Sequence, residues 1–385
     1  MLRSRRAKRG LNSDDMTNEA AHALAIETSE GAIRSDRAKR GLSSDDMEVI
    51  EDAGRAIRGG GLVVFPTETV FGLGADAFNA EAVARIYSAK GRPGDNPLIL
   101  HVANTEDFSR LAHEPPQYAF RLIEKFWPGP LTLVVRKNPS LPAWIGGHPS
   151  GTTDTIGIRM PRHPVAISLI RASHRTIAAP SANKAGKPSP TRLDHVLEDY
   201  NEDERWGIFF LDDCGYNGFV GLESTVVDVT GEKPVILRPG GVTAEEIFEI
   251  ATFLQNESPS HAQPRSPGMK YKHYAPSAEM IILSGEPRKI ASHILEATAR
   301  AGTVGALVSS ETQKHLPHPA PSNMTLGGIP GGDKKIIAQN FFANLREFDR
   351  LGVDIIYAES VCESGIGAAI MDRMRKAAEG RIINV

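Results

Sequence analysis

The sequence predicts an α/β protein of two domains joined by a linker, the second domain being smaller and Rossmann-like. Short apolar runs alternate with amphipathic helical patterns along most of the chain, which is typical of α/β domains. A segment rich in Pro, Ser, His and basic residues, 255–277, interrupts this alternation and has none of the periodicity of a packed element. The 385 residues, 41% of them hydrophobic, are sufficient for two buried cores.

The chain is expected to divide into four parts. Residues 1–46 carry a near-repeat, SRRAKRGLNSDDM at 4–16 and SDRAKRGLSSDDM at 35–47. Because a unit this short and polar cannot bury a face, we predict a partly disordered extension without a catalytic role rather than a solenoid. The first domain then covers residues 47–254, the linker covers 255–277 and the second domain covers 278–385.

A helix is expected to open the first domain. Asp46 is the predicted capping residue. Ile50, Ala53 and Ile57 form one apolar face, the glycines that follow end the helix, and a strand at 62–65 comes next. The other predicted elements of this domain are strands at 131–135, 156–160, 177–179 and 224–228 and helices at 81–89, 165–172 and 243–254.

The second domain repeats a strand-then-helix order. A chain that returns through a helix after each strand builds a parallel sheet, as in Rossmann-like folds. The predicted elements are strands at 280–283, 303–308 and 353–358 and helices at 288–300, 335–350 and 367–378.

Composition excludes several classes of protein. The 44 basic and 47 acidic residues nearly cancel, so no overall field favours nucleic acid or membrane, and any anion site must be local. No apolar run reaches the roughly 18 to 20 residues that span a bilayer, and the basic N-terminus lacks the apolar segment of a signal peptide. Cys214 and Cys362 lie far apart, which argues against a disulfide framework or a structural zinc site and favours the cytoplasm.

Two polar segments follow the first predicted strand. PTETVFGLGADA, 66–77, places Thr67 directly after the strand and is expected to turn through its glycines, where ligands of open α/β sheets commonly bind. The alternative is a glycine-rich turn with capping threonines. In KGRPGDNPLILHV, 90–102, Lys90 and Arg92 offer cations suited to phosphate.

Asn96 and His101 add hydrogen-bonding groups to this second segment. The alternatives are a helix end whose cations only complement the helix dipole, and a histidine with a structural role.

Four later segments carry further candidates. In GIRMPRHP, 157–164, Arg159 lies inside an apolar strand and requires a partner, either a protein carboxylate or an anionic ligand. Arg162 and His163 follow at the strand end, where solvated charge is expected. The donor-rich APSANKAGKPSPT, 179–191, could cradle phosphate with Ser181, Asn183 and Ser189, or be an ordinary loop. Ser224 begins a strand in GLESTVVD, and Arg238 follows another strand in ILRPGG.

Familiar nucleotide-binding sequences are missing. No GxxxxGK[ST] occurs, which excludes a P-loop NTPase. The GIG at 365–367 precedes a helix but is too incomplete for a dinucleotide-binding fingerprint, and it predicts a tight strand-to-helix turn.

Together the six segments resemble the YrdC-like domain of threonylcarbamoyl-AMP synthases, in the order of that family. SPGMKYKHYAP, 266–276, is similar to the linker of the two-domain long form. The resemblance implies a twisted open sheet for the first domain. It also implies an enzyme that condenses L-threonine, bicarbonate and ATP into threonylcarbamoyl-AMP and pyrophosphate, the first step of threonylcarbamoyladenosine modification of tRNA.

The resemblance further implies roles for individual residues. Lys90, Arg92 and Arg159 would be catalytic. The L-threonine pocket would comprise Thr67, His101, Arg159 and Ser224, and the ATP site would comprise Lys90, Arg92, Asn96, Thr155, Ser181, Asn183, Ser189, Arg238 and Tyr274.

The expected cofactor is Mg²⁺ carried by ATP, without a dedicated metal site in the protein and without an organic cofactor. The expected partners are a downstream threonylcarbamoyl-transferase complex and, weakly, tRNA, with no membrane. Two alternatives remain: an RNA-binding module, and a carbamoyltransferase of the hydrogenase-maturation type, whose zinc-finger cysteines and acylphosphatase region are not visible here.

Overall fold

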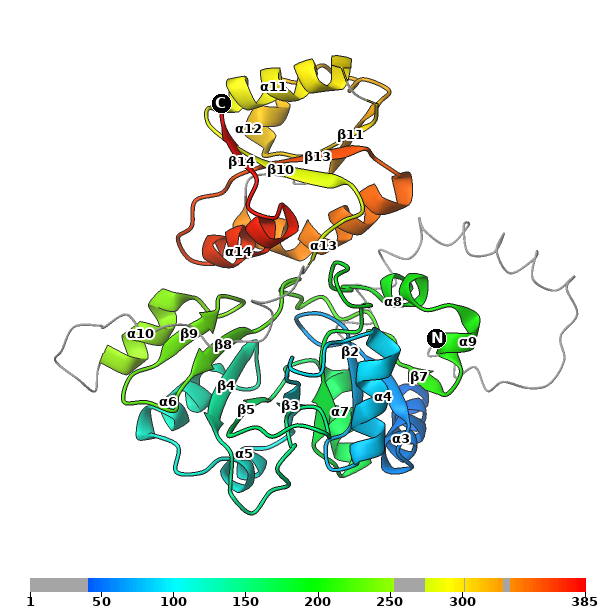
Figure 1. Cartoon of the computed structure of the whole chain (residues 1–385), viewed down its shortest axis with the longest axis vertical. Coiled ribbons are helices and arrows are strands. Elements are labelled where there is room, and N and C mark those ends of the chain that lie inside the picture. The colour runs from blue at the N-terminus through cyan, green and yellow to red at the C-terminus, as the bar shows by residue number, and fades with distance from the viewer. Residues whose placement is uncertain (1–40, 253–273, 301, 328–332) are drawn as a thin grey trace, which may run out of the picture.

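The computed structural model describes residues 41–252, 274–300, 302–327 and 333–385 and contains two sheets, each with its own helices (Figure 1). The α/β prediction, with a large twisted sheet and a smaller parallel one, is confirmed. The duplicated segment at 4–16 and most of the expected linker lie outside the described residues. The boundaries of the four expected parts stay predictions.

The first sheet has nine strands in the order β7-β1-β2-β6-β3-β5-β4-β8-β9. Its pairs are mixed: β3 and β5 are parallel, for example, whereas β4 and β5 are antiparallel. The strands are β1 Leu62–Phe65, β2 Gly72–Asp76, β3 Ile99–His101, β4 Leu131–Arg136, β5 Thr155–Arg159, β6 Ile177–Ala179, β7 Ile208–Phe210, β8 Thr225–Asp228 and β9 Val235–Arg238.

The expected turn through Gly72 and Gly74 is wrong, because both glycines lie in strand β2, antiparallel to β1. A Cβ atom on Gly74 would lie 2.6 Å from the side chain of Ile177 and 2.7 Å from the ring of Phe65. The glycines therefore allow close packing within a buried strand, which a sequence pattern does not distinguish from a turn.

Helix α3, Ser44–Arg58, confirms the predicted apolar face, since Ile50, Ala53 and Ile57 are buried. Its start differs from the prediction. Ser43 is the N-cap, and Asp46 is the third helical residue of a capping box in which each side chain accepts a hydrogen bond from the other's backbone N–H. The other helices here are α4 Ala80–Lys90, α5 Thr105–Leu111, α6 Gln117–Phe126, α7 Pro164–Ser173, α8 Leu193–Asp199, α9 Glu202–Arg205 and α10 Ala244–Thr252.

His163 does not carry the solvated charge that its position at a strand end suggested. The side chain is completely buried, and its Nδ1 accepts a hydrogen bond from the backbone N–H of Val165, so that it caps helix α7. Burial lowers the pKa of His163 to about 3. Only Arg162 of this pair is exposed, as predicted.

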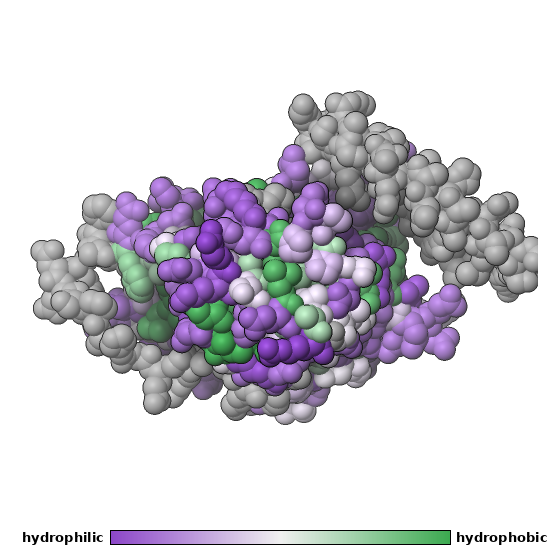
Figure 2. All heavy atoms as spheres, turned by 90° about the horizontal axis from the view of Figure 1, so that it is seen from above, coloured by the Kyte–Doolittle hydropathy of each residue, from purple (hydrophilic) through white to green (hydrophobic). Residues whose placement is uncertain are grey.

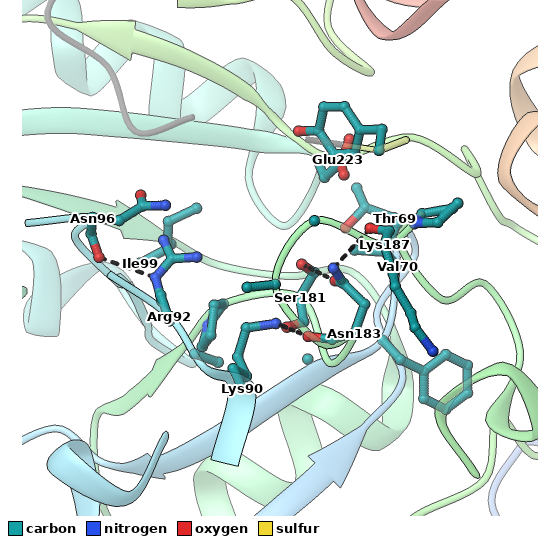
Figure 3. Close-up of a pocket in the computed structure, with 18 of the residues that line it drawn as sticks. Thr69, Val70, Lys90, Arg92, Asn96, Ile99, Ser181, Asn183, Lys187 and Glu223 are labelled. Atoms are coloured by element: carbon teal, nitrogen blue, oxygen red, sulfur yellow. Dashed lines mark hydrogen bonds between the residues drawn. The ribbon is translucent and has the colours of Figure 1, made fainter. Parts of the chain in front are cut away.

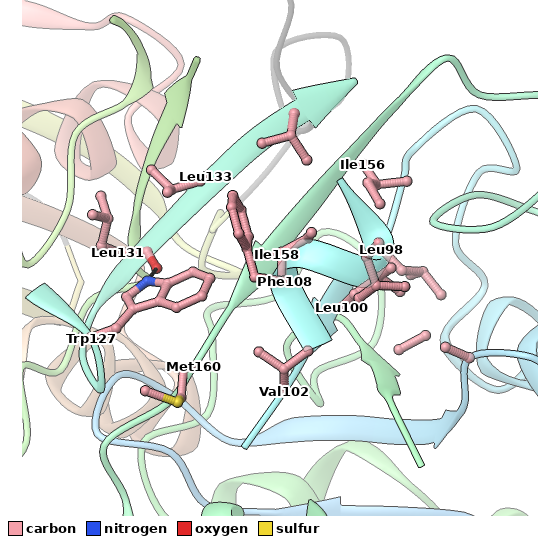
Figure 4. Packing of buried hydrophobic residues seen from close by; sticks show 14 of the residues in the cluster. Leu98, Leu100, Val102, Phe108, Trp127, Leu131, Leu133, Ile156, Ile158 and Met160 are labelled. Carbon is pink, nitrogen blue, oxygen red and sulfur yellow. Dashed lines mark hydrogen bonds between the residues drawn. The ribbon is translucent and has the colours of Figure 1, made fainter. Parts of the chain in front are cut away.

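An apolar core supports the middle of the first sheet (Figure 4). Leu100, Leu133 and Ile158 come from three neighbouring strands and are all fully buried. The rings of Phe108 and Trp127 pack edge to face against each other at 5.7 Å. Burial of each such side chain contributes about 1.5–3 kcal/mol to the stability of the fold. This packing holds the strands that carry the candidate residues in place.

The second sheet has five strands in the order β12-β11-β13-β10-β14, and all its pairs are parallel, which confirms the Rossmann-like prediction. Strands β12 and β14 and helix α12 were not predicted. The elements are β10 Glu279–Ser284, α11 Pro287–Arg300, β11 Val304–Leu307, α12 Ser310–Gln313, β12 Met324–Gly327, α13 Lys334–Leu351, β13 Ile355–Glu359, α14 Gly367–Ala377 and β14 Ile382–Asn384.

Helices α13 and α14 cover the face of the second sheet that is turned toward the first domain (Figure 1). Seen from the side of the second domain, the surface is mainly hydrophilic, with hydrophobic residues in small separate areas (Figure 2). In the part of the chain that the structure describes, no helix has the length and apolar character needed to cross a membrane.

Candidate functional site

A cavity of about 1100 Å³ lies between the two domains. The first domain supplies most of its wall, from strands β2, β3, β5 and β8 and the loops beyond them. Residues 274–277 and helix α13 of the second domain complete it, with Arg346, Asp349 and Arg350.

Every candidate residue except Ser189 lines this cavity. Ser189 is completely buried behind the wall, where its hydroxyl donates a 2.5 Å hydrogen bond to Glu223. The lining candidates are Thr67, Lys90, Arg92, Asn96, His101, Thr155, Arg159, Ser181, Asn183, Ser224, Arg238 and Tyr274.

Lys90 is the last residue of helix α4 and points into the cavity wall rather than into solvent. Gly91, with a left-handed φ of 62°, ends the helix. The Lys90 Nζ donates hydrogen bonds to the carbonyls of Ser181, at 2.5 Å, and Asn183 (Figure 3). Burial, and next the charge of Arg92, hold the pKa of Lys90 well below its ordinary value. The alternative interpretation of Lys90, an exposed cation that only complements the dipole of its helix, does not fit this buried position.

Arg92 and Asn96 form a second group at the same wall (Figure 3). The Arg92 Nε donates to the carbonyl of Asn96 at 3.0 Å, and its Nη2 donates to the carbonyl of Pro97 at 2.8 Å. Burial lowers the pKa of Arg92 to about 10, so the guanidinium remains charged at neutral pH. These contacts fix the direction of the side chain while its other N–H groups remain for an anion.

Arg159, the last residue of β5, has a protein carboxylate as its partner. Its Nη2 lies 2.8 Å from Oε1 of Glu68, and both side chains are almost completely buried. Its Nη1 donates to the hydroxyl of Thr69 at 2.9 Å. The hydroxyl of Thr69 lies 2.8 Å from that of Thr67, so one network joins Arg159 to the segment after β1.

His101 ends strand β3 beside Arg159 on β5, because the two residues are paired in register. Its Nδ1 lies 3.1 Å from the carbonyl of Ile99, which can only accept, so this nitrogen donates. Burial, together with the positive charge of Arg159, lowers the pKa of His101 to about 3. The imidazole is therefore neutral at physiological pH and supplies hydrogen bonding rather than charge.

Three histidines with a pKa of about 3 predict that the protein loses stability in mild acid. In the folded protein His101, His163 and His195 stay neutral, whereas in the unfolded chain they take up protons near pH 6.5. The free energy of unfolding is expected to fall between about pH 6.5 and pH 5, by about 2 kcal/mol for each histidine. Urea denaturation at both pH values measures this.

In a His163→Gln variant the free energy of unfolding should fall less between about pH 6.5 and pH 5 than it does in the wild type. An equal fall in the variant would show that His163 is not responsible. Glu223, whose pKa is lowered to about 2, does not interfere, because its contribution is lost only below its unfolded value of about 4.5.

Ser224 and Arg238 form the opposite side of the site. The Ser224 hydroxyl lies 2.8 Å from that of Thr132, which is completely buried. The Arg238 Nη2 donates to the Ser224 carbonyl at 2.9 Å and to its hydroxyl at 3.2 Å. Burial opposes the ionisation of the neighbouring Glu223, but Arg373 and Arg238 outweigh it and lower the pKa of Glu223 to about 2.

Tyr274 covers the cavity from the side of the second domain. It has a left-handed φ of 65°, and its ring centroid lies 5.3 Å from that of Phe342 in α13. The backbone N–H of the next residue, Ala275, donates to the carbonyl of Gly186, which ties this segment to the loop that carries Asn183. Thr155, in contrast, is an exposed residue at the start of β5.

Sequence reasoning noted a carboxylate directly after the first strand but did not pair any carboxylate with the buried cations. Glu68 follows Thr67 and Glu223 precedes Ser224, so each lies next to a residue that was singled out. The expectation that Arg159 requires a buried partner could have found Glu68. The cavity residue Asp199 and its partner Arg346 of the second domain had no such signal.

The comparisons with known proteins agree with this arrangement. Residues 55–240 match the family described as "Telomere recombination", and residues 242–379 match the one described as "Threonylcarbamoyl-AMP synthase, C-terminal domain". The threonylcarbamoyl-AMP synthase of Pyrococcus abyssi is 45% identical over 337 residues, 86% of this chain and 94% of that protein. The synthase of Bacillus subtilis is 42% identical over 338 residues, 87% and 94% of the two chains.

A solved structure of P. abyssi Sua5 complexed with L-threonine is similar along nearly its whole length. It has 44% sequence identity and a TM-score of 0.73, and the match covers 87% of this chain and 96% of that one. The relatives match both domains, in the same order. The chain is therefore an enzyme of the threonylcarbamoyl-AMP synthase family, in its two-domain form.

Proposed function

We propose that this enzyme condenses L-threonine, bicarbonate and ATP into threonylcarbamoyl-AMP and pyrophosphate. The observation that supports this most is one cavity, of about 1100 Å³, whose wall carries Lys90, Arg92, Arg159 and Arg238. Both reactants, a carbamate and a triphosphate, are anionic. Bringing them together requires fixed positive groups in a site shielded from water.

The reaction would proceed in two stages. The threonine amine attacks carbon dioxide derived from bicarbonate, loses a proton and becomes a carbamate. A carbamate oxygen then attacks the α-phosphorus of ATP, and the bond from that phosphorus to the oxygen bridging to the β-phosphate breaks, so that pyrophosphate leaves. Orientation of the bound reactants supplies at best about 7–11 kcal/mol, and no covalent nucleophile is needed.

The threonine pocket would lie between Thr67, His101, Arg159 and Ser224. Arg159 uses some of its N–H groups on Glu68 and Thr69, and a guanidinium with five donors retains others for the carboxylate of the amino acid. The relative solved with L-threonine supports a threonine site in this fold. The neutral His101 would form a hydrogen bond with the bound threonine, without competing with Arg159 for the carboxylate of the amino acid.

The ATP site would lie along Lys90, Arg92, Asn96, Thr155, Ser181, Asn183, Arg238 and Tyr274, with Ser189 acting from behind the wall through Glu223. Arg238 and Arg92 would face the phosphates as planar donors. Among the described residues no group of three or more His, Cys, Asp or Glu side chains is arranged to hold a metal ion. An Mg²⁺ ion would arrive with the triphosphate, held mainly by phosphate and water, and when bound it would neutralise phosphate charge.

The product would pass to a downstream threonylcarbamoyl-transferase complex that modifies tRNA. This enzyme itself would bind tRNA only weakly. We place it in the cytoplasm, since Cys214 and Cys362 are not joined in a disulfide. The sequence holds no further cysteines for the zinc fingers of the carbamoyltransferase alternative.

Replacing Tyr274 by alanine is expected to speed product release and to increase free AMP. Tyr274 lines the cavity and would lie over the bound nucleotide, so its loss would admit water to a hydrolysable carbamoyl-adenylate. Chromatography of AMP formed per pyrophosphate measures the leak. Tyr274→Phe is the matched control, because it keeps the ring contact with Phe342. AMP formation that is unchanged in Tyr274→Ala would contradict a covering role.

Pyrophosphate release from ATP and bicarbonate tests the proposed function directly. Release should depend on threonine, and serine should support it poorly because it lacks the methyl group. Release that ignores threonine, or none at all, would contradict the proposal. A steep salt dependence of RNA affinity without pyrophosphate release would instead favour the RNA-binding alternative.

A further inference from the structure

Arg373, on helix α14 of the second domain, reaches behind the wall of the cavity. It is completely buried and does not line the cavity itself. Its Nε donates to Oε2 of Glu223 at 2.9 Å, and its Nη1 donates to the carbonyl of Pro239 at 2.8 Å. One guanidinium from the second domain therefore contacts the first domain at two points.

Those two points are the chain neighbours of two proposed site residues. Glu223 directly precedes Ser224, and Pro239 directly follows Arg238. Arg238 in turn donates to the carbonyl and the hydroxyl of Ser224. Arg373 thus holds together, from behind, the two segments that present Ser224 and Arg238 to the cavity.

Charge gives this contact a second consequence. Glu223 is buried and ionised, with Ser189 donating to one oxygen and Arg373 to the other. Arg238 is the next cation that stabilises this carboxylate after Arg373. If Arg373 were absent, Glu223 would keep its charge only by attracting Arg238, which would draw the Arg238 guanidinium away from Ser224 and occupy it with a protein carboxylate.

The same guanidinium also borders the cover of the cavity. The centre of the Arg373 guanidinium lies 5.7 Å from the ring centroid of Tyr274, within the range of a cation–π contact. Asp372 accepts from Nη1 at 2.7 Å and helps to fix the group. The chain neighbours of Ser224 and Arg238 and the ring of Tyr274 thus meet at one side chain of the second domain.

We propose that Arg373 is a positioning residue of the nucleotide site: by neutralising Glu223 it leaves Arg238 to bind the nucleotide. This inference rests on the proposed use of Arg238 for ATP. The second domain then determines the charge of the site as well as covering it, and docking of the two domains and binding of ATP favour each other.

Replacing Arg373 need not separate the domains. Arg346 of helix α13 makes an independent contact, with hydrogen bonds to both oxygens of Asp199 at 3.1 and 2.8 Å and to the carbonyls of His195 and Pro188. Arg373→Met keeps much of the side-chain volume, and the variant is expected to fold with a lower melting temperature.

The test compares the wild type with Arg373→Met and the double variant Glu223→Gln/Arg373→Met. Arg373→Met should raise the KM for ATP by about tenfold or more, because it leaves a buried carboxylate that competes for Arg238. The double variant removes that carboxylate's charge and should return the KM to within about threefold of the wild type. If Arg373→Met acted only by loosening the contact between the domains, adding Glu223→Gln would not restore the KM, because the double variant also lacks the ion pair between positions 373 and 223.

The control is Arg375→Met, on the same helix, which breaks only an exposed ion pair with Glu363 and should leave the KM unchanged. An unchanged KM in Arg373→Met, or a double variant as impaired as the single one, would overturn the proposal. Calorimetry of the binding of a non-hydrolysable ATP analogue to the same proteins gives the same comparison without turnover. If the wild type binds the analogue but shows no threonine-dependent turnover, the proposed function fails and the role of Arg373 is still decided.

Discussion

Arg159→Ala is expected to abolish threonine-dependent pyrophosphate release. The guanidinium is the one proposed contact for the threonine carboxylate that carries a charge, because the neighbouring His101 is neutral. Loss of a buried charge-assisted contact costs about 2.7–4 kcal/mol, which corresponds to about 10²- to 10³-fold in kcat/KM for threonine. The KM for ATP should change much less.

The same variant is expected to be less stable, for a reason unrelated to catalysis. Glu68 is almost completely buried, with only 1% of its surface exposed, and Arg159 is its ionic partner at 2.8 Å. Removing one member of a buried pair leaves an uncompensated charge and costs about 3–5 kcal/mol. Thermal unfolding would therefore show a lower melting temperature, which could by itself reduce activity.

A double variant separates the two effects. Glu68→Gln/Arg159→Met removes both charges, so it should recover most of the stability while threonine-dependent release stays absent. Arg162→Ala is the matched control, because Arg162 is an exposed arginine three residues away whose side chain donates only to the carbonyl of Pro128 among the described contacts. Threonine-dependent turnover that returns with stability in the double variant would contradict a carboxylate-binding role for Arg159.

Elements with strong periodicity were predictable from the sequence, whereas small buried ones were not. Helix α3 was predicted correctly because its apolar residues follow the helical period, and strand β1 because it is a short continuous apolar run that follows a cluster of glycines. Strand β2 was missed because its glycines serve close packing against Phe65, a contact made only after folding. Strand β14 was missed because its three residues are all exposed at a sheet edge, so it has no buried face to mark it.

The candidate site shows the same division. Residues on segments dense in polar and small side chains could be selected, and all but Ser189 line one cavity. What could not be selected were partners far away in sequence. Arg373 and Glu223 are 150 positions apart, and Arg346 and Asp199 are 147 apart. No local pattern relates them, because each pair exists only once the second domain has docked on the first.

Lys90→Met is expected to have the second large effect, on the ATP side. The Lys90 amine is buried and donates hydrogen bonds to the carbonyls of Ser181 and Asn183, so its loss removes a hydrogen-bond donor and also releases the loop that the two carbonyls belong to. Removal of one preorganised donor at a site of developing charge costs about 10²- to 10³-fold in rate. The matched control is Lys184→Met, a nearby lysine bonded to Ala89 and Glu204 that does not line the cavity.

The lowered pKa of Lys90 makes this role measurable apart from turnover. Burial and Arg92 favour the neutral amine, whereas a bound triphosphate would favour the charged one and raise the pKa. Binding of a non-hydrolysable ATP analogue should therefore take up a proton when the pH lies above the lowered pKa, and affinity should fall as the pH rises further. Calorimetry in buffers of different ionisation enthalpy detects the uptake. Lys184→Met should retain it and Lys90→Met should lose it, while uptake that persists in Lys90→Met would assign the proton to another group and remove Lys90 from the phosphate site.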